Sequence, residues 1–147
     1  MNTGKGIEDM KTKSKAVPSN YTAVQTCEKK ILIIDDEHMV CETLQDILQE
    51  DGYDVRIALD ALSGLSEIEK DPPDLVISDL KLPDISGIEL LRRVKSERPY
   101  MEIIIMTGLG EAETYLEAKE EGAFDYIIKP INIPILRLMI SKVLCNS

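Results

Sequence analysis

The sequence predicts an α/β fold in which helices cover both faces of an open, doubly wound parallel sheet. Short continuous apolar runs alternate with segments of helical periodicity, and this alternation repeats five times from residue 30 onward. Such alternation produces parallel strands joined by right-handed crossovers. Five strands are too few to close a barrel of eight strand–helix units, so we expect the sheet to stay open.

Four of the predicted strands are continuous apolar runs, which are typical of strands buried on both faces. They lie at residues 31–34, 75–77, 103–106 and 126–128. Residues 54–58 alternate between polar and apolar side chains instead, and this pattern predicts an edge strand.

The helices between these strands are predicted from apolar spacing and from residues that start or stop helices. Gly52 suits the left-handed cap that ends the first helix, and Ser86 suits the start of the third. The predicted helices cover residues 40–52, 61–70, 86–98 and 112–122, and a last helix begins at Asn132 as its cap, with Pro134 in its first turn.

Composition narrows the function classes. The 147 residues include 27 Asp plus Glu against 17 Lys plus Arg, a net charge of -10, with a pI near 4.6. Direct binding to nucleic acid is not expected, because neutralising phosphates requires clustered basic residues. No apolar run approaches the roughly 18 residues of a membrane span, and residues 1–20 lack a secretory signal.

The composition and apolar pattern of the sequence change near residue 30, which indicates a domain boundary there. Residues 1–29 are rich in Lys, Thr, Ser and Asn without apolar periodicity, so we expect a flexible N-terminal extension. Residues 30–147 then form a single domain of common size. The three cysteines match no zinc or redox spacing, so we expect reduced thiols and a cytoplasmic location.

Polar residues directly follow the predicted apolar strands, although none of them helps a strand to form. Asp35 and Asp36 follow the first run, Asp79 closes the third strand, Thr107 follows the fourth and Lys129 follows the fifth. Ligands of open α/β sheets bind beyond the carboxyl ends of the strands. We therefore expect these five side chains to share one edge of the sheet.

The chemistry of this set points to phosphoryl transfer. Two carboxylates about 4 Å apart repel by roughly 4 kcal/mol at an effective dielectric constant near 20. Either a bound proton or a divalent cation can relieve that repulsion, and Mg²⁺ suits one or two carboxylates combined with a phosphate. Lys129 and Thr107 offer an ammonium and a hydroxyl to phosphoryl oxygens.

Residues 30–144 resemble the receiver domain of bacterial two-component response regulators. Besides the strand-end residues, the resemblance rests on Pro83, Gly87, the Gly-Ala-Phe-Asp-Tyr run at 122–126, and Lys129 followed by Pro130. It implies a flavodoxin-like fold with a five-stranded sheet of order 2-1-3-4-5.

The resemblance also implies a role for each site residue. Asp79 would accept a phosphoryl group from a sensor histidine kinase or a phosphotransfer protein. Mg²⁺ would be bound by Asp36, Asp79 and the backbone carbonyl of Lys81, with Asp35 acting through a water. Lys129 and Thr107 would bond phosphoryl oxygens, and Tyr126 would be the switch aromatic that follows Thr107 inward. The protein would be no enzyme beyond Mg²⁺-dependent self-phosphorylation and autodephosphorylation.

Relatives of this kind present their fourth helix, fifth strand and fifth helix to partners, so a homodimer through this surface is one implied partner. The last predicted helix has a wide apolar arc, with Leu138 outside it, which suits either burial against the sheet or a partner face. A stand-alone receiver and a receiver fragment of a longer transcriptional or ATPase regulator both remain open.

Two other functions compete. A Mg²⁺-dependent aspartyl-phosphate phosphatase would need an Asp two residues after its nucleophile, where this sequence has Lys81. A flavin carrier would need a phosphate-binding loop after the first strand, where this sequence has two aspartates and Glu37. Lys81 and Leu109 also occupy the positions that tune acyl-phosphate hydrolysis in relatives.

Overall fold

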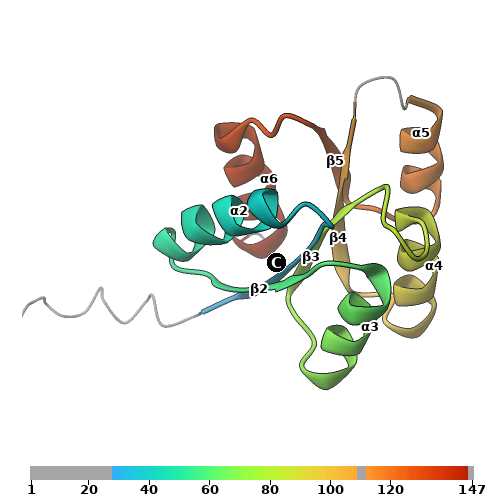
Figure 1. Cartoon of the computed structure of the whole chain (residues 1–147), viewed down its shortest axis with the longest axis horizontal. Helices are drawn as coiled ribbons and strands as arrows, with labels where there is room; N and C mark the ends of the chain where they lie inside the picture. Colours follow the sequence, from blue (N-terminus) through green and yellow to red (C-terminus); the bar gives the residue numbers. More distant parts are fainter. Residues whose placement is uncertain (1–27, 109–111, 146–147) are drawn as a thin grey trace, which may run out of the picture.

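The computed structural model describes residues 28–108 and 112–145, and Figure 1 shows its single sheet with helices on both sides. The sheet has five parallel strands in the order β2-β1-β3-β4-β5. The strands are β1 (Lys30–Ile34), β2 (Asp54–Ala58), β3 (Leu75–Asp79), β4 (Glu102–Thr107) and β5 (Asp125–Ile128). This confirms the predicted fold class, the implied strand order, and residues 54–58 as an edge strand.

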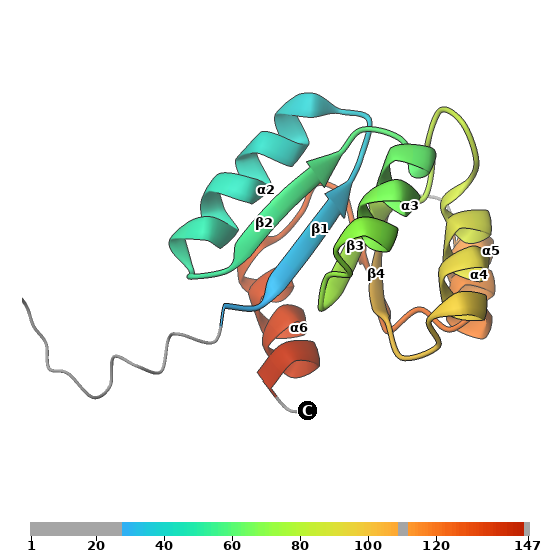
Figure 2. The ribbon, with the colours of Figure 1, turned by 90° about the horizontal axis from the view of Figure 1, so that it is seen from below.

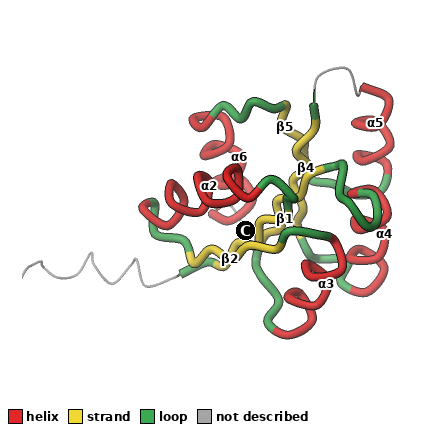
Figure 3. The backbone as a smooth tube through the Cα atoms, viewed as in Figure 1, coloured by secondary structure: helices red, strands yellow, loops and turns green. Residues whose placement is uncertain are grey.

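The helices alternate with the strands along the chain (Figure 3). They are α2 (His38–Glu50), α3 (Ala61–Lys70), α4 (Gly87–Glu97), α5 (Ala112–Glu120) and α6 (Ile133–Cys145). Helix α4 begins after Ser86, whose side chain accepts from Glu89 N at 3.1 Å. Asn132 accepts from Ile135 N at 3.0 Å before α6. Both predicted caps are therefore confirmed.

Helices lie on both faces of the sheet (Figure 2), and each face buries an apolar core. Helices α3, α4 and α5 cover one core, while α2 and α6 cover the other. The strand β1 contributes Leu32 and Ile34 to the first core and Ile31 and Ile33 to the second, all fully buried. Burial on both faces explains why its sequence is a continuous apolar run.

Gly52 ends α2 with a φ of +100°, as its position in the sequence predicts. The predicted flexible extension, residues 1–29, falls almost entirely outside the described residues and stays a prediction. Within residues 28–108 and 112–145, none of the helices has both the length and the apolar character needed to cross a membrane.

Candidate functional site

The site lies where the chain reverses its direction of winding across the sheet. Helix α2 follows β1 onto one face, whereas α4 follows β3 onto the other. Since β1 and β3 are neighbours, their carboxyl ends open into the crevice between these two connections. Ile34 pairs with Ser78, so the next residues along, Asp35 and Asp79, come to the same level of the sheet edge.

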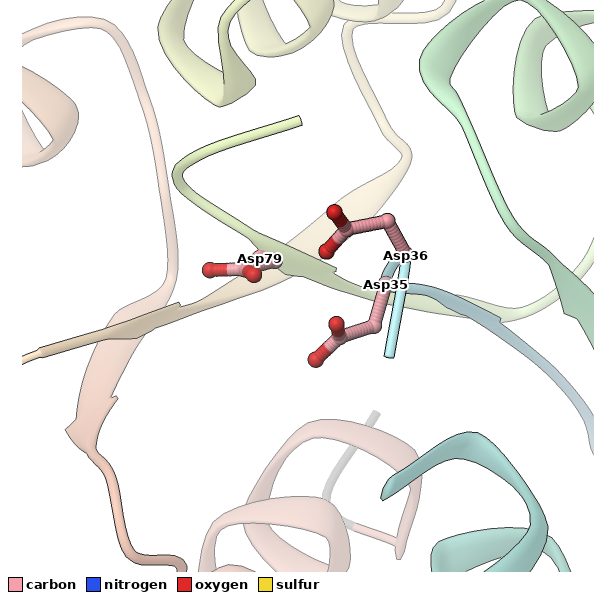
Figure 4. Close-up of side chains that lie close together, drawn as sticks. All are labelled: Asp35, Asp36 and Asp79. Carbon is pink, nitrogen blue, oxygen red and sulfur yellow. The ribbon is translucent and has the colours of Figure 1, made fainter. Parts of the chain in front are cut away.

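Three carboxylates converge there, as Figure 4 shows. Asp35, Asp36 and Asp79 each offer an oxygen, and these oxygens all lie within 4.8 Å of one another. Asp35 has no exposed surface and Asp79 is 8% exposed, whereas Asp36 faces solvent. The set therefore combines two buried negative charges with one that solvent can reach.

Lys129 places a positive charge among these carboxylates. Its Nζ lies 2.9 Å from Asp35 Oδ2 and 3.1 Å from Asp79 Oδ2. A third bond, of 3.2 Å, reaches Glu37 Oε1 at the outer rim. The lysine is held in place from the next strand, because its backbone N–H donates to Thr107 O at 2.8 Å.

Hydrogen bonds hold both the side chain and the backbone of Asp35. Its carboxylate Oδ1 accepts from Glu37 N at 2.9 Å. Its backbone carbonyl oxygen accepts from the Sγ of the buried Cys41 at 3.2 Å. Burial, and then the charge of Asp35, raise the pKa of the Cys41 thiol to about 12. The thiol consequently stays protonated at neutral pH and can remain the donor in this bond.

The two partners of the central ion pair are both perturbed. Burial raises the pKa of the Asp79 carboxyl, the charge of Asp35 raises it further, and Lys129 offsets only part of this. Burial lowers the pKa of the Lys129 ammonium, but its bonds to Asp35 and Asp79 more than compensate and raise the pKa overall. Lys129 is therefore protonated at neutral pH, whereas the surroundings of Asp79 disfavour its ionised form.

The segment after Asp79 stays close to its carboxylate. Lys81 N donates to Asp79 Oδ1 at 3.3 Å, and Leu80 N donates to Met106 O at 2.9 Å. Gly87 N then donates back to Leu80 O at 2.7 Å. A Cβ on Gly87 would lie only 2.6 Å from the Asp79 carbonyl oxygen, so this close approach requires glycine.

Thr107 and Tyr126 lie on the two strands beyond β3. The buried Thr107 ends β4, and its hydroxyl donates to Gly108 O at 3.3 Å. The half-buried Tyr126 lies on the edge strand β5, and its ring centroid is 3.7 Å from that of Tyr115 on α5. Leu109, expected to influence hydrolysis, lies outside the described residues.

The structure brings the side chains of Asp35, Asp36, Asp79 and Lys129 together and places Thr107 at the end of the neighbouring strand β4, as expected from the sequence. Three contacts were not predicted. They are the bond from Lys129 to Glu37, the packing of Tyr115 on Tyr126, and the contacts of Asp84 with the start of α3. Only the first had a signal in the sequence, since Glu37 directly follows the acidic pair.

The donor set fits a hard divalent cation. Asp35, Asp36 and Asp79 offer only carboxylate oxygens, the ligand type that Mg²⁺ prefers. The raised pKa of Asp79 adds a physical reason, because a second positive charge beside Lys129 would relieve the repulsion that Lys129 leaves.

Known proteins match this chain over nearly the whole described region. A family model for the response regulator receiver domain matches residues 31–141. Sporulation initiation phosphotransferase F of Bacillus subtilis is 37% identical over 116 residues, which cover 79% of this chain and 94% of that protein. Transcriptional regulatory protein ZraR of Klebsiella oxytoca is 35% identical over 117 residues, 80% of this chain. The match spans only 26% of ZraR.

Solved structures agree. A response regulator receiver domain protein from Clostridium thermocellum superposes with a TM-score of 0.76 at 35% identity, covering 80% of this chain and 94% of that one. A CheY-like receiver domain protein from Methanospirillum hungatei gives 0.74 at 38% identity, covering 79% and 94%. With the sheet order and the acidic edge already described, these matches show that the chain belongs to the family of response regulator receiver domains.

Proposed function

We propose that Asp79 is the phosphoacceptor of a phosphorylation-controlled signalling module. An oxygen of its carboxylate would attack the phosphorus of a phosphohistidine on a sensor kinase or phosphotransfer protein. The new P–O bond forms an acyl phosphate, the P–N bond breaks, and the departing imidazole takes up a proton. The observation that carries this proposal is the position of Lys129 Nζ, 3.1 Å from Asp79 Oδ2 and 2.9 Å from Asp35 Oδ2.

Asp36, Asp79 and the backbone carbonyl of Lys81 are the proposed Mg²⁺ ligands, with Asp35 acting through a water. Bound Mg²⁺ would supply positive charge against the phosphoryl oxygens and the crowded carboxylates. The ammonium of Lys129, already within bonding distance of Asp79, would transfer one of its hydrogen bonds to a phosphoryl oxygen.

The same site would drive the switch. A phosphoryl group adds about -1.5 to -2 charges and three acceptor oxygens to Asp79. Thr107 would turn its hydroxyl from Gly108 O toward one of these oxygens, and Tyr126 would follow. Because Tyr126 packs on Tyr115, that movement would reach α5 and change the surface formed by α5, β5 and α6.

That surface is the proposed partner face, with a second copy of the chain as its occupant. Exposed apolar side chains lie on all three of its elements: Leu116 on α5, Ile128 on β5, and Ile135 and Leu138 on α6. The relatives indicate two contexts for such a module, a protein that is almost entirely a receiver domain and a longer regulator that contains one. This chain matches 94% of sporulation initiation phosphotransferase F but only 26% of ZraR.

Incubation with acetyl phosphate and MgCl₂, followed by intact-mass measurement, tests the proposal directly. We expect one added phosphoryl group on the wild-type chain and none without Mg²⁺. Asp79→Asn should abolish the gain, because the amide oxygen is a poor nucleophile. Asp46→Asn is the matched control: Asp46 is an exposed aspartate in the middle of α2, and its variant should be phosphorylated like wild type.

Two outcomes would contradict the proposal. One is a wild-type chain that gains no mass at any Mg²⁺ concentration. The other is an equal gain in Asp79→Asn, which would move the acceptor to a different residue.

A further inference from the structure

The segment between β3 and α4, residues 80–86, is tied to a helix far from it in sequence. Asp84 Oδ1 accepts from Ala61 N at 3.0 Å, and Oδ2 accepts from Leu62 N at 2.8 Å. The Oδ1 atom also accepts from Ile85 N at 2.9 Å. One exposed carboxylate thus joins the segment that follows Asp79 to the first turn of α3.

The hydrogen bonds from Ala61 and Leu62 to Asp84 are favoured by the partial positive charge at the N-terminus of α3. The first N–H groups of a helix lack partners within it and carry partial positive charge. Asp60 satisfies one of them, accepting from Ser63 N at 2.7 Å, and Asp84 satisfies those of Ala61 and Leu62. Slight burial opposes the ionisation of Asp84, yet these donors hold the pKa of its carboxyl below the ordinary value.

The attachment of Asp84 to α3 also restricts residues 80–83, which connect Asp84 to Asp79 at the acidic site. Lys81 lies three residues before Asp84, and its N–H already donates to Asp79 Oδ1 at 3.3 Å. Pro83, directly before Asp84, fixes one backbone dihedral between them. With Leu80 bonded to Met106 at one end and Asp84 bonded to α3 at the other, the backbone of Lys81 has little freedom.

We propose that Asp84 is a positioning residue: by capping α3 it holds the Lys81 backbone beside Asp79, in the place where its carbonyl serves as a ligand. The inference rests on the proposed Mg²⁺ site. Groups that orient metal ligands without touching the metal commonly change metal affinity by about 10–100-fold when they are removed. Helix α3 thereby takes part in metal binding, although none of its own side chains does.

The test is a titration of the ¹⁵N-labelled chain with MgCl₂, followed by the amide signals of the acidic edge. Asp84→Ala should raise the half-saturating Mg²⁺ concentration about tenfold. Asp84→Asn, which keeps one acceptor oxygen, should give a smaller rise. Phosphorylation by acetyl phosphate should slow at low Mg²⁺ and recover at saturating Mg²⁺.

Asp60→Ala is the matched control, since it removes an aspartate cap from the same helix without touching residues 80–86. It should lower thermal stability much as Asp84→Ala does, yet leave the half-saturating Mg²⁺ concentration unchanged. Equal Mg²⁺ affinity in Asp84→Ala and wild type, or an equal loss in Asp60→Ala, would overturn the positioning role alone. If Asp84→Ala fails to fold, Asp84→Asn decides by the same comparison. A wild-type chain that binds no Mg²⁺ would overturn the proposed function as well.

Discussion

Asp79 carries a charge that its surroundings oppose. Burial and the neighbouring Asp35 raise the pKa of its carboxyl above the ordinary 3.8, even with Lys129 at 3.1 Å. A raised pKa means that the folded chain binds this proton more tightly than the unfolded chain does. The ionised carboxylate therefore lowers stability at neutral pH, and this loss disappears as the pH falls below 3.8.

We accordingly expect Asp79→Asn to melt at a higher temperature than wild type at pH 7 without Mg²⁺. The gain in free energy should be about 1 kcal/mol, roughly 3–5 °C for a domain of this size. The difference should shrink as the pH is lowered toward 4. Thermal melts in EDTA measure this difference in melting temperature. Asp46→Asn is the control, because it also removes one negative charge, but at an exposed position. A lower melting temperature for Asp79→Asn would refute the crowded-charge argument.

At the scale of elements, the start of α4 is pressed against the end of β3. A Cβ on Gly87 would lie 2.6 Å from Asp79 O and 2.8 Å from Leu80 Cα. Both of these are backbone atoms, which cannot turn aside as a side chain would. Gly87→Ala should therefore force α4 outward and cost about 1–3 kcal/mol.

Urea unfolding of Gly87→Ala measures this cost. Gly108→Ala serves as its partner experiment, because a Cβ at Gly108 would meet no atom within 4 Å. We expect Gly108→Ala to stay near the wild-type unfolding midpoint. Equal midpoints for the two variants would show that the close approach of α4 to β3 is not the source of the constraint.

The helices and strands could be predicted because the burial of each one is reflected in its own pattern of apolar and polar residues. Strand β1 is buried on both faces and apolar from Ile31 to Ile34, whereas the sequence of the edge strand β2 alternates between polar and apolar residues. Strand order is different, since periodicity says nothing about which strands are neighbours, and it came from family resemblance. The strand ends then gave Asp35, Asp79 and Lys129, because parallel strands finish at one edge.

Other contacts in the site could not be predicted, since they depend on side-chain directions and loop paths. Glu37 directly follows the acidic pair, but its bond to Lys129, 92 residues away, depends on the direction of its side chain. Asp84 reads as an ordinary turn residue after Pro83, yet it bonds residues 22 and 23 positions earlier. The expected flexible extension at residues 1–29 and the expected effect of Leu109 stay predictions.

At the scale of the whole molecule, the α5–β5–α6 surface should control self-association. Leu138 is 64% exposed on α6. We expect sedimentation velocity to show more dimer after phosphorylation, and Leu138→Glu to restore the monomer, because two copies meeting through one face would bury this side chain twice. Leu62→Glu, at a 55% exposed position on α3, should leave the dimer intact. A phosphorylated chain that stays monomeric, or equal loss in both variants, would exclude this face.

The pairing of Asp35 with Lys129 across 94 residues also bears on how the protein is made. A ribosome adds Asp35 94 residues before Lys129, so a growing chain contains the acid before it contains the counter-ion. A product that stopped before residue 129 would have to bury an unanswered charge or leave its interior open. The buried charge of Asp35 is therefore paired only after residue 129 has been made, and products that stop earlier should be less stable and more readily degraded.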